Sequence, residues 1–287
     1  MFDGFDLDRV DVGEVSLRVR HGGNGPPVVL LHGHPRTHTT WHAVAPQLVA
    51  RHTVVAPDLR GYGRSTLPPD EPDHAQSSKR AMARDVARLM THLGHDRFAV
   101  VGHDRGSLVA FRTAMDHPDR VTHLVVMDGL PVLEHLERTD ATFALAWWHW
   151  WFLGQTAKPA ERVICADPDS WYETPPATEL GEGNHADLWA ALRDPAVVHG
   201  MCEDYRAGLV VDRRHDEDDR AAGRRVACPT MLLESGRDDL DLHGDPGAIW
   251  PSWLAHPLRH HVIDCGHHQA ELAPDEVAAY LLDFLAR

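Results

Sequence analysis

The sequence has 287 residues, of which 43% are hydrophobic and 25% charged, and its formal net charge is -15 with histidine neutral. This length suits one large α/β domain that carries an insertion, with enough core to hold an active-site cavity. The acidic residues are spread along the chain, and solubility alone accounts for them. We therefore expect a small-molecule substrate, and neither a nucleic acid nor an anionic membrane as partner.

The start of the chain, Met1 to Val10, has acidic residues where a signal peptide needs a basic start and an apolar run. No later segment stays apolar for long enough to span a membrane. The four cysteines lie far apart without a Cys-x-x-Cys pair, which favours reduced thiols over a disulfide framework. These features predict a cytoplasmic protein.

Short β-branched runs alternate with glycine and proline turns in the first part of the chain, and these runs predict strands. The predicted strands are 16–20, 27–32, 53–57, 98–103 and 123–128, with helices expected at 79–93 and 107–115. Strands that alternate with helices indicate a parallel sheet covered by helices on both faces.

The alternation stops at about residue 131, where the chain becomes rich in tryptophan, proline and charge, and it resumes near residue 221. Two more strands are expected at 229–234 and 259–264, followed by a closing amphipathic helix at 274–285. We interpret residues 1–130 and 221–287 as an α/β core and residues 131–220 as an inserted helical cap.

A nucleophile turn is predicted at Asp104. The segment Phe98-Ala-Val-Val-Gly-His-Asp-Arg-Gly-Ser joins an apolar strand, a turn with small residues on both sides of Asp104, and a helix. This is the strand-turn-helix pattern of a nucleophile elbow, with aspartate in the place usually held by serine. An aspartate there can displace a leaving group from an sp³ carbon and form an ester. The alternative is a tight turn whose aspartate only caps the helix.

The expected base is His267, in Asp264-Cys-Gly-His-His, on the loop between the last strand and the final helix. It would activate the water that hydrolyses the ester, which requires a neutral imidazole held by a carboxylate. His268 beside it is an alternative base. Asp128, at the end of a strand, and Asp239, after the next strand, are the candidate carboxylates, and we favour Asp128.

Four histidines near the first loop, His32, His34, His38 and His42, have a spacing that superficially suggests a metal site. No accompanying set of cysteine or carboxylate ligands supports zinc there. We expect neither a metal nor an organic cofactor.

Several further motifs give the chain a family resemblance. They are Leu30-Leu-His-Gly-His-Pro-Arg, Asp58-Leu-Arg-Gly-Tyr-Gly-Arg-Ser, Gly102-His-Asp-Arg-Gly, Asp128-Gly-Leu-Pro, His149-Trp, Cys202-Glu-Asp-Tyr-Arg-Ala-Gly and Gly266-His. With these the sequence resembles the fluoroacetate and haloacetate dehalogenases of the α/β-hydrolase fold, which are similar to epoxide hydrolases. The resemblance runs from about residue 15 to the C-terminus.

The resemblance implies an α/β-hydrolase fold, a mostly parallel sheet flanked by helices with an inserted helical cap, and a possible homodimer. It also implies that Asp104 is the nucleophile, His267 the base and Asp128 its partner. His149, Trp150 and Tyr205 would donate hydrogen bonds to the departing halide, which imidazole, indole and phenol groups can do. The alternative for the tryptophan-rich run is simple packing of a cap helix.

The resemblance further implies that Arg105 pairs with a substrate carboxylate, since a guanidinium offers two parallel donors to that group. Two positions depart from the family pattern. Leu108 stands where fluoroacetate-active members have a second arginine, and His34 stands where an aromatic residue is common. We expect Leu108 and His34 to alter the substrate pocket, and fluoroacetate to be a poor substrate.

The leading interpretation is therefore hydrolytic dehalogenation of a small haloacid through an aspartyl ester. An epoxide hydrolase would share the Asp104 and His267 machinery but needs tyrosines in the cap, of which the sequence offers Tyr172 and Tyr205. A non-catalytic receptor on a hydrolase scaffold is the alternative from another class, because fold alone does not fix function.

Overall fold

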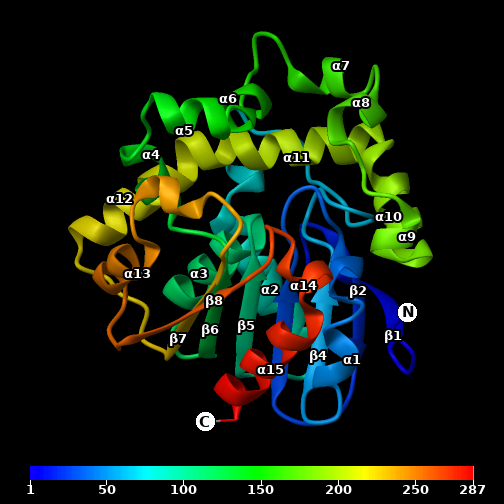
Figure 1. The fold of residues 1–287 in the computed structure, drawn as a ribbon, viewed down its shortest axis with the longest axis vertical. Coiled ribbons are helices and arrows are strands. Elements are labelled where there is room, and N and C mark those ends of the chain that lie inside the picture. Colours follow the sequence, from blue (N-terminus) through cyan, green and yellow to red (C-terminus); the bar gives the residue numbers. More distant parts are fainter. Residues whose placement is uncertain (287) are drawn as a thin grey trace.

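The computed structural model describes residues 1–286, which fold around one twisted eight-stranded sheet (Figure 1). Its strand order is β1-β2-β4-β3-β5-β6-β7-β8. Strands β3 to β8 run parallel, and β2, next to the edge strand β1, is antiparallel to both of its neighbours. The strands are β1 Asp6–Asp11, β2 Ser16–Gly22, β3 Pro27–Leu31, β4 Thr53–Pro57, β5 Phe98–His103, β6 Val121–Met127, β7 Thr230–Ser235 and β8 Leu258–Ile263.

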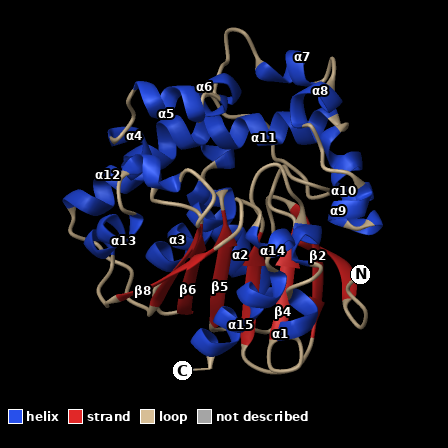
Figure 2. Cartoon of the chain, in the orientation of Figure 1, coloured by secondary structure: helices blue, strands red, loops and turns tan. Residues whose placement is uncertain are grey.

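Helices cover both faces of this sheet (Figure 2). The core helices are α1 Ala45–Leu48, α2 Lys79–His92, α3 Arg105–Asp116, α13 Pro246–Ile249, α14 Gln269–Leu272 and α15 Pro274–Leu285. Alternate residues of each central strand enter different apolar clusters: in β5, Val100 packs with α2 and α3, whereas Val101 packs with α1 and α15. This period of two explains why the central strands are apolar throughout.

The helices between β6 and β7 lie across one end of the sheet, at the top of Figure 1. They are α4 Val132–Glu137, α5 Ala141–Ala146, α6 His149–Leu153, α7 Ala160–Ile164, α8 Pro168–Tyr172, α9 Ala177–Leu180, α10 Glu182–Leu192, α11 Pro195–Ala207 and α12 Arg213–Ala221. We call this set the cap. A π-helical turn, Gly208–Asp212, joins α11 to α12. The exact boundaries between the core, 1–130 and 221–287, and the cap, 131–220, remain a prediction.

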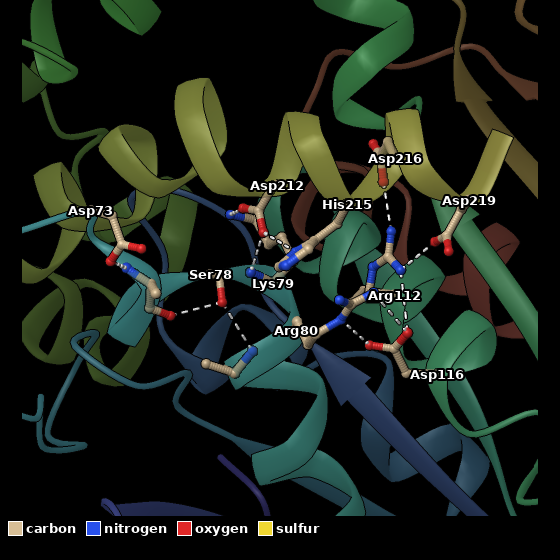
Figure 3. Close-up of polar contacts among 12 residues, drawn as sticks. Asp73, Ser78, Lys79, Arg80, Arg112, Asp116, Asp212, His215, Asp216 and Asp219 are labelled. Atoms are coloured by element: carbon tan, nitrogen blue, oxygen red, sulfur yellow. Dashed lines mark hydrogen bonds and ion pairs between the residues drawn. The ribbon is translucent and has the colours of Figure 1, made fainter. Parts of the chain in front are cut away.

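Buried ion pairs attach α12 to the core (Figure 3). Arg112 of α3 donates to Asp216 at 2.7 Å and to Asp219 at 2.5 Å, and its side chain is 2% exposed. The backbone N–H of Lys79, at the start of α2, donates to Asp212 at 2.8 Å. A buried arginine needs such carboxylates, because an unpaired charge in the interior is costly.

The predicted strands and helices agree with the structure to within a few residues. The short core helices α1, α13 and α14 were not predicted, and neither was β1. Its sequence, Asp-Leu-Asp-Arg-Val-Asp, is largely exposed at the sheet edge, so it carries little of the apolar signal that marks a strand. Among the described residues 1–286, no helix has both the length and the apolar character needed to cross a membrane.

Candidate active site

Asp104 stands on a sharp turn between β5 and α3, at the carboxyl end of the sheet. Its φ of 51° and ψ of -118° are strained values for a residue with a side chain. Gly102 and Gly106 make the turn possible, because a Cβ at Gly102 would lie 2.1 Å from the carbonyl oxygen of Gly106. The backbone N–H of Asp104 donates to Met127 of β6 at 3.0 Å, which fixes the turn against the neighbouring strand.

The loop after β3 holds one oxygen of this carboxylate. The backbone N–H of His34 donates to Asp104 Oδ1 at 2.7 Å. Gly33 allows the approach, since a Cβ there would lie 2.5 Å from the same oxygen. Oδ1 therefore sits where a backbone donor could stabilise negative charge, and Oδ2 remains directed toward His267.

A cavity of about 200 Å³ lies between this turn and the cap. It is lined by His34, Asp104, Ala146, Trp147, His149, Tyr205, Asp238, Asp239, His267 and His268. Burial lowers the pKa of His34 to about 3 and that of His149 to about 4, so both rings are neutral near pH 7. The cavity thus holds two uncharged imidazoles, those of His34 and His149, near the carboxylate of Asp104.

His267 lies between Asp104 and a carboxylate that the sequence analysis did not name. Its Nε2 is 3.7 Å from Asp104 Oδ2, and its Nδ1 is hydrogen-bonded to Asp238 Oδ2 at 2.6 Å. Asp128 Oδ2 lies farther away, 3.8 Å from Nδ1. Asp239 does not bind the ring, because it accepts a hydrogen bond from Trp147 Nε1 at 2.7 Å. The expected choice between Asp128 and Asp239 therefore omitted the carboxylate that makes the hydrogen bond.

The ionisation of Asp104 and that of His267 depend on each other. Burial favours neutral forms of both Asp104 and His267, but each stabilises the charge of the other. As a result the pKa of Asp104 lies well below the usual value of an aspartate. The pKa of His267 lies well above the usual value of a histidine, and Asp238 also helps to raise it. Asp104 and His267 form an ion pair in the resting protein.

Arg105, expected to pair with a substrate carboxylate, is 1% exposed and lies behind the cavity wall. Its Nε donates to Asp204 Oδ2 at 2.9 Å, and its Nη2 donates to both Oδ1 and the carbonyl oxygen of Asp204. Nη1 is buried without a hydrogen-bond partner. The edge of the guanidinium formed by Nε and Nη2 is thus already paired with Asp204, and only the two N–H groups of Nη1 are without a partner.

The other expected binding residues divide into two groups. His34, His149 and Tyr205 line the cavity, whereas Leu108 and Trp150 are buried behind it. Trp150 packs edge-on against Tyr205 and also contacts the guanidinium of Arg105. Trp147, three residues earlier on the cap, occupies the wall instead. Which of these tryptophans reaches the cavity depends on how the short cap helices turn, and the sequence pattern did not reveal this.

The first-loop histidines serve separate contacts. His32 Nε2 accepts from the backbone N–H of Leu59 at 3.0 Å, and His38 Nδ1 pairs with Asp58 at 2.7 Å. Groups of potential ligand atoms within 4.8 Å of one another occur elsewhere, at His103/His267/His268, Asp128/Asp238/His267 and Asp70/His199/Glu203. The first two belong to the surroundings of His267.

The profile of the alpha/beta hydrolase fold matches residues 26–274 of the sequence. This chain belongs to the alpha/beta hydrolase fold family. The hydrolase is 41% identical to a fluoroacetate dehalogenase from Burkholderia sp., over all of this chain and 95% of that protein. It is 31% identical to a soluble epoxide hydrolase from Corynebacterium sp. strain C12, over 92% of this chain and 91% of the other.

Solved structures agree with these relationships. A provisionally assigned alpha/beta hydrolase from Nostoc sp. PCC 7120 superimposes with a TM-score of 0.96 at 37% identity, over 100% of both chains. A provisionally assigned epoxide hydrolase from Pseudomonas aeruginosa gives a TM-score of 0.92 at 40% identity, over 100% of this chain and 97% of that one. The hydrolase is therefore an enzyme of the dehalogenase-like type, close to fluoroacetate dehalogenase and to epoxide hydrolases.

Proposed function

We propose that this hydrolase removes halide from a small haloacid or related haloalkyl compound through a covalent ester on Asp104. The observation that carries the proposal is the placement of Asp104, with Oδ1 held by the His34 backbone at 2.7 Å and Oδ2 directed into the cavity beside His267. A carboxylate that is held through one oxygen and turns the other toward the cavity is arranged for in-line attack on carbon.

In the first step Asp104 Oδ2 attacks the carbon that bears the halogen. A carbon–oxygen bond forms, and the halide leaves with the electron pair of the broken bond. His149 and Tyr205 line the cavity where a donor to that halide is needed. The neutral state of His149, whose pKa burial lowers to about 4, lets it donate a hydrogen bond without pairing with Asp104.

In the second step His267 acts as the base. Ester formation removes the negative charge of Asp104, so the pKa of His267 falls and its proton can leave to solvent. The neutral ring then takes a proton from water, and the resulting hydroxide attacks Cγ of Asp104. The His34 N–H supports the oxyanion on Oδ1. Collapse releases the alcohol, which takes its proton from His267, and the regenerated carboxyl group ionises.

Epoxide hydrolysis would use the same nucleophile, but it also requires acidic side chains that donate a proton to the oxygen of the epoxide ring. Tyr205 lines the cavity, whereas the hydroxyl group of Tyr172 contacts the sulfur of Met201 at 3.7 Å. Only one of the two cap tyrosines is thus available on the cavity wall among the described residues. This arrangement supports a halide leaving group more than an epoxide oxygen.

The test is halide release by the purified protein from fluoroacetate, chloroacetate, bromoacetate and 2-chloropropionate, with diol formation from styrene oxide measured in parallel. Asp104→Asn should release no halide, and mass spectrometry is used to check that its amide stays intact. His267→Gln should release one halide per protein and gain the mass of the alkyl group. Diol without halide would move the enzyme to the epoxide hydrolases, and neither product with no ester would favour a receptor.

A further inference from the structure

The charges on the cavity wall restrict the substrates that the cavity can accept. Three aspartates line it, Asp104, Asp238 and Asp239, whereas His267 is the one cationic side chain among the described residues that do so. Burial would raise the pKa of Asp238, but its contact with His267 lowers that pKa, so Asp238 is ionised near pH 7, as Asp104 is. Two ionised carboxylates and one imidazolium give the wall a net negative charge even without Asp239.

Two buried arginines lie near the cavity, and each already has a carboxylate partner. Arg105 is bound to Asp204, and its guanidinium is stacked on the ring of Tyr205, with Cζ 4.1 Å from the ring centroid. Arg36, on the loop after β3, donates from Nη2 to Glu271 at 2.9 Å, and both side chains are 5% exposed. Neither arginine is among the residues that line the cavity. The wall therefore has no free cation for an anionic substrate within the described part of the chain.

A haloacid would add a third negative charge at the worst place. Its carboxylate is next to the carbon that Asp104 attacks, and like charges about 4 Å apart repel strongly inside a protein. The only cation at hand, His267, is already shared between Asp104, at 3.7 Å, and Asp238, at 2.6 Å. An uncharged haloalkyl compound would not meet this repulsion.

Two imidazoles on the wall have hydrogen-bonding capacity to spare. Nδ1 of His34 and Nδ1 of His268 are buried and have no hydrogen-bond partner among residues 1–286. The His34 ring lies edge-on to Tyr205 at 5.3 Å, and the His268 ring lies 5.2 Å from the ring of His267. Burial lowers the pKa of both, so both rings are neutral near pH 7. The proposed function uses neither side chain.

The hydrogen-bonding character of a neutral imidazole matches an uncharged polar group. One ring nitrogen donates and the other accepts, and amide and hydroxyl groups also do both. A carboxylate can only accept. Since a buried polar atom without a partner is costly, a substrate that pairs with these two nitrogens gains affinity.

We propose that the substrate is an uncharged haloalkyl compound with an amide or hydroxyl group, and that His34 and His268 bind this group. The proposal rests on the proposed function, because Asp104 remains the nucleophile and halide the leaving group. It narrows the substrate class from haloacids to uncharged compounds.

The first test compares kcat/KM for halide release from chloroacetamide, chloroacetate and 1-chloropropane. Each value is divided by the rate constant for the same compound with acetate ion in water, which corrects for its intrinsic reactivity. We expect the corrected value for chloroacetamide to exceed that for chloroacetate by about tenfold or more.

The second test removes the two imidazoles. His34→Phe and His268→Phe should each lower kcat/KM for chloroacetamide by about two- to tenfold, mainly through KM, and should affect 1-chloropropane less, since it has no polar group. His34→Asn and His268→Asn keep a donor and an acceptor and should lose less. The matched control is His185→Phe, because the His185 ring stacks on Trp189 of the cap and does not line the cavity.

The third test requires no turnover. Propionamide and propionate are unreactive analogues of chloroacetamide and chloroacetate, and saturation-transfer NMR measures the binding of each to the wild-type protein at pH 7. We expect propionamide to bind more tightly by about tenfold or more.

A corrected kcat/KM for chloroacetate equal to or above that for chloroacetamide would overturn the proposal, as would tighter binding of propionate. Equal losses with chloroacetamide and 1-chloropropane in the two phenylalanine variants would remove the assigned role of His34 and His268. If no compound released halide while propionamide bound more tightly than propionate, dehalogenation would fail, and the preference of the cavity for uncharged ligands would stand.

Discussion

Arg105 and Asp204 form a buried ion pair behind the cavity, with Nε and Oδ2 2.9 Å apart. The side chain of Asp204 has 0% exposure, and that of Arg105 has 1%. Gly208 of the π-helical turn makes room for the guanidinium, because a Cβ there would lie 3.1 Å from Nη2. The positive charge of Arg105 is therefore largely neutralised by Asp204 of the cap, which limits its use as an anchor for an acid substrate.

Replacement of Leu108 tests this view of substrate selection. Leu108→Arg adds a second guanidinium on α3, near Arg105, and each charge-assisted hydrogen bond contributes about 1–3 kcal/mol. We expect the ratio of kcat/KM for chloroacetate to that for chloroacetamide to rise by about tenfold or more. Leu108→Gln is the control, since it adds polarity without charge. An unchanged ratio in a well-folded Leu108→Arg protein would argue that this position does not reach the substrate.

The two cap tyrosines, Tyr205 and Tyr172, allow a controlled test of which hydroxyl group donates a hydrogen bond to the leaving group. Tyr205→Phe removes a cavity-lining hydroxyl and should lower kcat for halide release by about 100-fold, the loss typical of a donor to developing negative charge. Tyr172→Phe removes a hydroxyl that contacts Met201 and should have little effect. Comparable losses in both variants, seen with styrene oxide as substrate, would instead support epoxide opening by two tyrosines.

The two chemical steps should respond differently to pH. Ester formation needs ionised Asp104, and since its pKa is lowered, the halide burst should stay constant from about pH 6 to about pH 9. Ester hydrolysis needs neutral His267. The ester removes the contribution of Asp104 to its raised pKa, but the contribution of Asp238 remains, so the hydrolysis rate should increase with pH until the proton is lost. Rapid-quench halide assays separate the steps. A burst that rises with pH in parallel with hydrolysis would contradict these assignments.

The attachment of the cap to the core should depend on Arg112. Arg112→Leu leaves Asp216 buried without an arginine partner and leaves Asp219 with Arg224 alone, so the free energy of unfolding should fall by about 3–5 kcal/mol. Arg213→Gln breaks the exposed pair with Glu217 and should cost only about 0–1 kcal/mol. Urea denaturation measures both changes. Equal losses of unfolding free energy in the two variants would show that the buried ion pairs of Arg112 stabilise the protein no more than the exposed pair does.

The sequence by itself determined the features that depend on neighbouring residues. Apolar runs and turn residues predicted the central strands, and the glycines around Asp104 predicted its sharp turn. The position of His267 after the last strand followed from the order of the elements. Each of these signals is local, since a strand, a turn or a helix start is specified by residues close to one another in the chain.

Only the tertiary structure decided which side chains meet. Asp238 and Asp239 are adjacent, and the loop directs one to His267 and the other to Trp147. Arg105 is paired with Asp204, 99 residues away. Successive residues of an irregular loop point in different directions, and contacts between distant residues depend on how the cap packs against the sheet. No periodicity in the sequence encodes either choice.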